Sequence, residues 1–174
     1  QDCHEDEFKE IAGSIHGRRA QGERAIKDCN GCHGSLHTVF KGGDPDSPLS
    51  PVNQIKTCGG CHEDMMANYE SSKHARALLK AGLVGSAPSC SSCHGKHEIH
   101  AKDDPAATTH HTKIPATCGS CHSGVLKDFN ESAHGTAITA GRKGPVCSTC
   151  HESHAIKDPG AAATRHMVSD GCGN

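Results

Sequence analysis

The stretch TCGGCHEDMMANYESSKHA, residues 57–75, contains a pattern that recurs along the chain. Two cysteines, Cys58 and Cys61, are separated by two residues and are followed directly by His62. A polar run that suits a helix comes next, and it ends in His74, twelve residues after His62. Related runs predict helices over 5–19, 63–80 and 124–139, each of which begins just after a Cys-His pair and carries a second histidine near its end.

Five complete C-x-x-C-H motifs occur in the chain. Their cysteines are Cys29, Cys32, Cys58, Cys61, Cys90, Cys93, Cys118, Cys121, Cys147 and Cys150. This pattern is typical of c-type haem attachment, because two thiols bond the vinyl groups on one porphyrin edge and the following imidazole ligates the iron. Zinc or iron–sulfur sites and disulfides also use paired cysteines, but neither requires histidine after the second cysteine. The sequence therefore favours covalent haem c over these rivals.

The composition provides too few apolar side chains for an ordinary hydrophobic core. Leu, Ile, Val and Phe together make up 23 of 174 residues, and there is no Trp and one Tyr. The formal charge of the polypeptide is only −2, so self-repulsion does not explain the shortage of apolar residues. We expect bound haem to replace the missing core, and no run of about 20 apolar residues is present to span a membrane.

The motifs divide the chain into three repeats of about 1–57, 58–117 and 118–174. Each repeat is expected to bind two haems. After its second motif, each repeat has a further histidine and then an Asp-Pro sequence. We expect Asp-Pro to lie in a loop, because proline and the residue before it disfavour helix.

Histidines supply the expected iron ligands. Six follow a cysteine in motif position: His4, His33, His62, His94, His122 and His151. Six others recur in register and are candidate distal ligands: His16, His74, His134, His37, His97 and His154. The numbers of the two kinds of ligand balance at six. Four histidines lie outside the shared pattern: His100, His110, His111 and His166.

Spacing restricts the pairing of these ligands. His97 is three residues after His94, and three extended residues span at most about 10 Å, too little to reach the opposite face of the same porphyrin. His37, His97 and His154 should therefore ligate haems other than the one attached just before them. Two histidines saturate an iron, so we expect an electron carrier and no enzyme. The alternative is a reductase of small nitrogen or sulfur compounds with one open haem.

The arrangement resembles the large multihaem cytochromes of respiring bacteria and archaea, including those that polymerise into extracellular filaments. The resemblance rests on residues 57–62, on Ser72-x-His74, on residues 87–99 and on Ile114-Pro-Ala-Thr-Cys118. It implies a fold that is mostly coil with short α-helices wrapped around a chain of covalent haems, with little or no β structure. It also implies alternating stacked and T-shaped haem pairs.

The two ends of the sequence carry half-motifs. Cys3-His4 is the second half of a haem motif, and Cys172-Gly-Asn is the first half. Three interpretations remain open: a fragment of a longer repeat array, a haem shared by Cys172 of one subunit and Cys3 of the next, or a haem on Cys3 through one thioether. We expect six haems per chain, five of them from complete motifs, and the shared haem would make a head-to-tail homopolymer.

The expected partners follow from charge and compartment. Six ferric haems with ionised propionates would bring the formal charge to about −8, which favours basic redox proteins or extracellular electron acceptors and gives no hint of nucleic acid. Haem attachment of this type takes place outside the cytoplasm. We therefore expect an extracellular or cell-surface location, or alternatively a periplasmic one.

Overall fold

The computed structural model describes residues 4–18, 29–41 and 43–160. Within these ranges the chain is mostly helical with coil and has no β-strand, only an isolated bridge between Val84 and Ala87. No helix in these ranges is long and apolar enough to cross a membrane.

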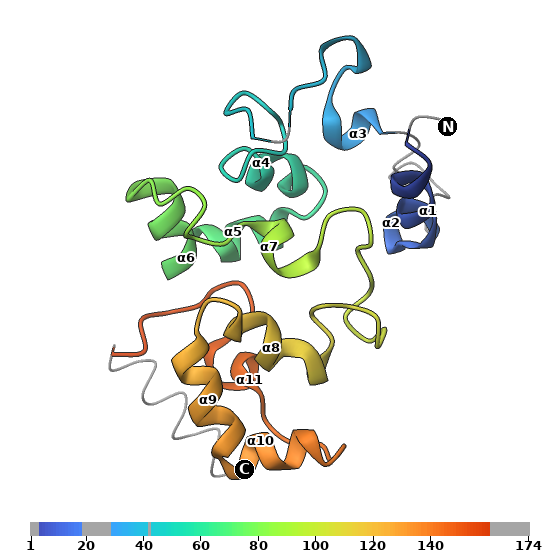
Figure 1. Ribbon diagram of the computed structural model, residues 1–174. Coiled ribbons are helices and arrows are strands. Elements are labelled where there is room, and N and C mark those ends of the chain that lie inside the picture. Colours follow the sequence, from blue (N-terminus) through green and yellow to red (C-terminus); the bar gives the residue numbers. More distant parts are fainter. Residues whose placement is uncertain (1–3, 19–28, 42, 161–174) are drawn as a thin grey trace.

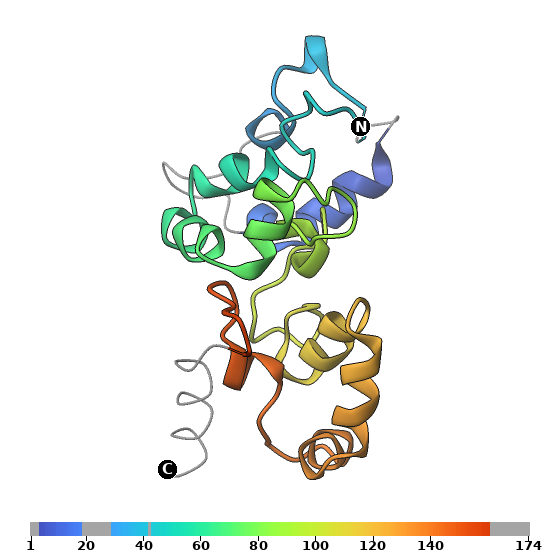
Figure 2. The same cartoon turned by 90° about the vertical axis from the view of Figure 1, so that its left-hand side faces the viewer.

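The first repeat contributes short elements near one end of the molecule (Figures 1 and 2). They are α1 (Glu5–Gly13), α2 (Ile15–Arg18), α3 (Asn30–His33) and the 3-10 helix η1 (Leu36–Thr38).

The second repeat occupies the middle of the molecule, and α4 leads into it. Its elements are α4 (Gln54–Gly59), α5 (Glu63–Glu70), α6 (Lys73–Ala75), the π-helical turn η2 (Arg76–Lys80) and α7 (Cys90–His94).

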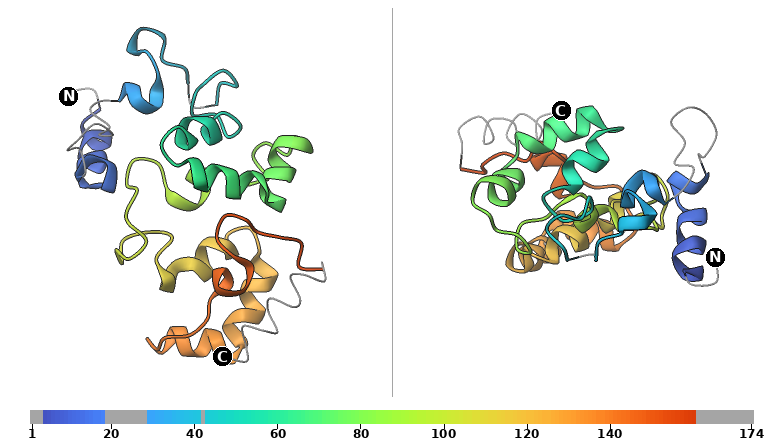
Figure 3. Two further views of the ribbon diagram at one scale, coloured as in Figure 1. Left: turned by 180° about the vertical axis from the view of Figure 1, so that it is seen from behind. Right: turned by 90° about the horizontal axis from the view of Figure 1, so that it is seen from above.

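The third repeat lies at the other end in both side views and from behind (Figure 3). A 3-10 helix, η3 (His111–Lys113), leads into it. Its helices are α8 (Ile114–Gly119), α9 (Ser123–Glu131), α10 (Ala133–Thr139) and α11 (Cys147–His151). The three repeats thus follow one another along the molecule in chain order.

The predicted helices over 5–19, 63–80 and 124–139 are wrong as single helices. Each is interrupted at a serine with extended backbone, at Ser14, Ser72 and Ser132. Residue 19 lies outside the described residues. The break has a physical cause, because the serine side chain caps a new helix: Ser72 Oγ accepts the Ala75 N–H at 3.0 Å.

The same serine geometry recurs in the other two repeats. Ser14 Oγ accepts the Gly17 N–H at 3.1 Å, and Ser132 Oγ accepts the Gly135 N–H at 3.2 Å. A Cβ atom at Gly17 or Gly135 would collide with backbone of the preceding helix. The third residue after the serine is therefore glycine in the first and third repeats, whereas the second repeat accommodates the buried Ala75 there.

Side chains form only a small core. Ile55, Leu78 and Ala87 make one buried cluster, against which Met66 and Tyr69 pack. The Tyr69 hydroxyl donates to the carbonyl of Pro88, and burial raises the pKa of Tyr69 to about 12. This cluster combines Ile55, at the end of the first repeat, with residues of the second repeat, and it includes no residue of the third.

Candidate functional site

Each complete motif lies in or at the end of a short helix, namely α3, α4, α7, α8 or α11. Cysteines three apart on a helical turn point to the same side, which brings the two thiols of a motif together. All ten motif cysteines are unbonded thiols. Cys3 and Cys172 lie outside the described residues.

Two of the motif helices pack on their successors, α4 on α7 and α8 on α11. The packing places Cys58 in hydrogen-bond contact with Cys90, and Cys118 with Cys147. The hydrogen bond from Cys58 lowers the pKa of the Cys90 thiol to about 7 and raises that of Cys58. Motifs that follow one another in sequence are therefore neighbours in space.

Thiols of the remaining successive motifs are also close enough to interact electrostatically. The negative charge of Cys61 adds to burial in raising the pKa of Cys32, and Cys121 acts in the same way on Cys93. Hydrogen bonds or electrostatic interactions between thiols thus connect each complete motif to the next, from the first to the fifth.

Two imidazole pairs form between a Ser-x-His histidine and the first motif of the next repeat. The ring centroids of His16 and His62 are 6.1 Å apart, and those of His74 and His122 are 6.2 Å apart. In each pair the first histidine is placed by the serine-capped turn two residues before it. The pairing therefore joins the first repeat to the second and the second to the third.

Two further pairs join the second motif of one repeat to the distal histidine of the next. His33 and His97 are separated by 6.1 Å, and His94 and His154 by 5.9 Å, between ring centroids. His97 thus faces His33 of the preceding repeat and not His94, its neighbour in sequence. Every one of the four pairs contains one motif histidine and one candidate distal histidine.

Burial and the facing ring both act on these imidazoles. Desolvation first, and then the charge of the opposite imidazole, lower the pKa of His16, His74 and His94. The same two causes lower the pKa of His33 through His97. A lowered pKa favours the neutral ring, which is the form that ligates metal.

The pairs have the dimensions of a two-sided iron site. Two imidazoles that ligate one iron from opposite faces, each through a bond of about 2 Å, would have centroids about 6 Å apart. One pair at this distance would pass for an ordinary aromatic contact. Four pairs in two repeating registers, each beside a pair of motif thiols, fit haem c.

The described residues do not form a metal site made of protein ligands alone. Within 4–18, 29–41 and 43–160, no group of three or more His, Cys, Asp or Glu side chains is placed to hold a metal ion. A porphyrin supplies four ligands itself, so each imidazole pair supplies the two that its iron would still need.

The other predicted ligands are not brought to a partner ring. In the part of the chain that the structure describes, no ring pair includes His4, His37, His134 or His151, and all four are exposed. The charge of His4 does help to lower the pKa of His33. His4 Nδ1 lies 3.8 Å from Glu7.

The histidines outside the repeat pattern have other contacts. His100 Nδ1 lies 3.2 Å from a carboxylate oxygen of Asp104, and His110 Nδ1 lies 2.9 Å from the hydroxyl of Thr112. His166 lies outside the described residues. Sequence reasoning missed the capping role of Ser14, Ser72 and Ser132, although a serine recurs two residues before His16, His74 and His134.

Comparison with known protein families, with characterised proteins and with solved structures found no match to this chain.

Proposed function

We propose that this chain carries electrons along a row of covalently attached, bis-histidine-ligated haems. The observation that carries the proposal is the set of four imidazole pairs, each at 5.9–6.2 Å between centroids and each made of one motif and one distal histidine. Bound haem would supply an iron that alternates between the ferric and ferrous states.

The chain's own residues would have three roles in this function. The motif thiols attach each porphyrin edge to a short helix, and the imidazole pairs hold the iron from both faces. The contact of Cys58 with Cys90, and of Cys118 with Cys147, keeps successive attachment points close. Because each imidazole pair spans two repeats, every ligated iron also fastens one repeat to the next.

Two ligands per iron leave no position for a substrate, which favours a carrier over an enzyme. We further propose that the chain is a polymerising subunit of an extracellular cytochrome filament, or part of a longer multihaem array. Redox proteins or extracellular acceptors would be its partners.

One observation favours a second candidate, a reductase of small nitrogen or sulfur compounds. His151 belongs to a complete motif, yet it faces no imidazole among the described residues. An iron there with a single protein ligand could bind a substrate.

Haem content is the direct test. The protein should be produced in a host that attaches haem c, and its intact mass and peptide masses should be measured. We expect haem on every complete motif, with the absorption spectrum of low-spin iron. Free thiols or disulfides at these cysteines in the natural protein would refute the proposal.

Carbon monoxide separates the two candidates. A carrier whose irons are all saturated should show no rapid carbon monoxide binding in the reduced, assembled state. Stoichiometric binding at one haem in that state would favour the reductase instead.

A further inference from the structure

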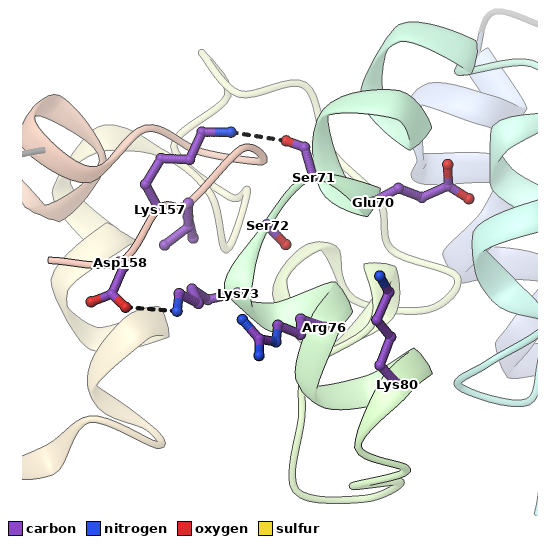
Figure 4. Close-up of a pocket in the computed structure, with 9 residues that line it drawn as sticks. Glu70, Ser71, Ser72, Lys73, Arg76, Lys80, Lys157 and Asp158 are labelled. Carbon is purple, nitrogen blue, oxygen red and sulfur yellow. Dashed lines mark hydrogen bonds and ion pairs between the residues drawn. The ribbon is translucent and has the colours of Figure 1, made fainter. Parts of the chain in front are cut away.

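The junction between the second and third repeats is built from a small set of contacts (Figure 4). The Lys73 backbone N–H donates to the Ile156 carbonyl at 2.9 Å, and Lys73 Nζ lies 2.6 Å from a carboxylate oxygen of Asp158. Lys157 Nζ donates to Ser71 Oγ at 3.1 Å. The loop after the distal histidine of one repeat thus docks on the serine-capped turn of the repeat before it.

The junction between the first and second repeats has the same backbone hydrogen bond but a different ion pair. The Ile15 N–H donates to the Ile99 carbonyl at 2.7 Å, and the Arg18 guanidinium lies 3.3 Å from Asp104. Ile15 and Lys73 each follow the capping serine, and Ile99 and Ile156 each lie two residues after a distal histidine. A shift of one repeat therefore superposes the two backbone hydrogen bonds. The basic side chain on the Asp-Pro loop differs, because Arg18 lies four residues after its serine and Lys73 lies one residue after its serine.

The imidazole pairs obey the same shift. Each junction carries one pair from a Ser-x-His histidine and one pair from a second-motif histidine. This pairing pattern occurs at both junctions within the chain. The third repeat carries the two histidines, His134 and His151, that would form the same pairs at a third junction.

The histidines that would pair with them belong to the first repeat. By the same pattern, His134 would pair with the histidine of the first motif in a following repeat, and His4 occupies that position in the first repeat. His151 calls for a distal histidine, which corresponds to His37. All four side chains are exposed, and none of them forms a ring pair with another imidazole in the part of the chain described here.

The surface around His37 also differs from its counterparts. Leu36, Val39 and Phe40 are exposed by 61%, 54% and 40%. Ile99 and Ile156, which occupy the position of Val39 in the other repeats, are partly covered at their junctions. An apolar surface beside an unpaired ligand fits a site that another repeat covers.

The two sets of groups belong to repeats that lie apart in the molecule. The elements η1 and α3 lie at one end in Figures 1 and 2, and α10 lies at the other. A contact between them cannot close within one chain, and such a head-to-tail contact generates an open filament.

We propose that a second copy of this chain completes the third junction, with its His4 facing His134 and its His37 facing His151. The two rings of each pair would ligate one haem iron across the interface, so the inference rests on the function proposed above. The Ala133 N–H would donate to the Val39 carbonyl of the second copy, as Lys73 donates to Ile156. The basic partner of the Asp-Pro loop would not recur, because Ala133 stands where Lys73 stands and Thr136 stands where Arg18 stands.

The first experiment removes one ligand from each proposed pair and keeps the motif histidines. Haem-loaded wild-type protein and the double variant His37→Ala/His134→Ala would be compared by analytical ultracentrifugation and electron paramagnetic resonance over a range of concentrations. We expect wild-type protein to assemble, with high-spin iron disappearing as it does. The double variant should stay monomeric and keep high-spin iron at every concentration.

A matched control is His111→Ala, which replaces another exposed histidine outside the repeat pattern and should assemble like the wild type. Unchanged assembly of the double variant, or a wild-type protein that is monomeric and fully low-spin, would overturn the interface while leaving the haem function intact. Absence of covalent haem in the intact mass would overturn both proposals.

A second experiment assigns the pair across the interface. His37→Ala alone should produce one high-spin haem in the assembled protein, and that haem should be the one on the motif of His151. Adding Cys147→Ser and Cys150→Ser should then remove the high-spin signal. Persistence of the signal would show that His37 serves a different iron and would refute the pairing.

Discussion

The second and third repeats have nearly the same local structure but different surroundings. In both, a helix ends at a serine, the serine caps a second helix, and a histidine follows two residues later. His74 of the second repeat faces His122, whereas His134 of the third faces no ring among the described residues. The difference shows that a repeat positions its own ligands, while the following repeat supplies their partners.

The largest effect should come from removing a cofactor attachment in the middle of the molecule. Cys90→Ser with Cys93→Ser should lose one haem and lower the melting temperature by about 10 °C or more, because the haem of this motif would join the second repeat to the third through His94 and His154. Intact mass and circular dichroism would measure both changes. The matching pair Cys147→Ser and Cys150→Ser should lose one haem with less destabilisation, and equal or greater destabilisation would contradict this ranking.

Loss of a distal ligand should have different effects on the haem spin state in the second and third repeats. In dilute protein, His74→Ala should convert one haem from low to high spin, because His122 loses its facing ring. His134→Ala should leave the spectrum of dilute protein unchanged, since nothing in the described chain faces it. Electron paramagnetic resonance measures the difference, and identical spectra for the two variants would remove the distinction between these repeats.

Only part of the fold and of the candidate site could be predicted from the sequence. The sequence predicts the attachment cysteines, the twelve candidate ligands and the scarcity of strand, and the structure confirms short helices without strand in the described residues. It could not predict which rings face each other, because the partners come from different repeats and spacing only excludes neighbours such as His94 and His97. It also missed the break at Ser72, since a helix-compatible run on both sides hides a capping turn.

Removal of a capping serine should have a moderate effect. Ser72 is 3% exposed and accepts the Ala75 N–H, so Ser72→Ala should destabilise the protein by about 1 kcal/mol and lower the melting temperature by a few degrees. Ser132→Ala should have a similar effect on the third repeat. Ser86→Ala, at an exposed serine, is the control. A control as destabilised as Ser72→Ala would argue against the cap.

The smallest effect should come from the ion pair between Lys73 and Asp158. The hydrogen bond from Lys73 lowers the pKa of Asp158, so the ion pair stabilises the folded chain above about pH 4, the usual pKa of Asp, and is lost as the pH falls through the lowered value. Asp158→Asn should therefore lower the melting temperature slightly at neutral pH, and the difference should vanish in acid and in high salt.

Asp128→Asn, at an exposed carboxylate on α9, is the control for this substitution. A destabilisation by Asp158→Asn that persisted unchanged in acid would show that the loop depends on some other contact.

The contact between Cys58 and Cys90 sets a condition on biosynthesis. Two thiols from different motifs lie together, and the pKa of one is lowered to about 7, so a large share of it is thiolate at neutral pH. In an oxidising compartment such a thiolate would attack the disulfide of an oxidised dithiol catalyst, and Cys58 would then displace the catalyst's thiol to leave a Cys58–Cys90 disulfide. Under the proposed function this disulfide would block both motifs for haem. The chain should therefore need a dedicated thiol reductant up to the moment of attachment, and without one it should accumulate as a crosslinked, colourless product.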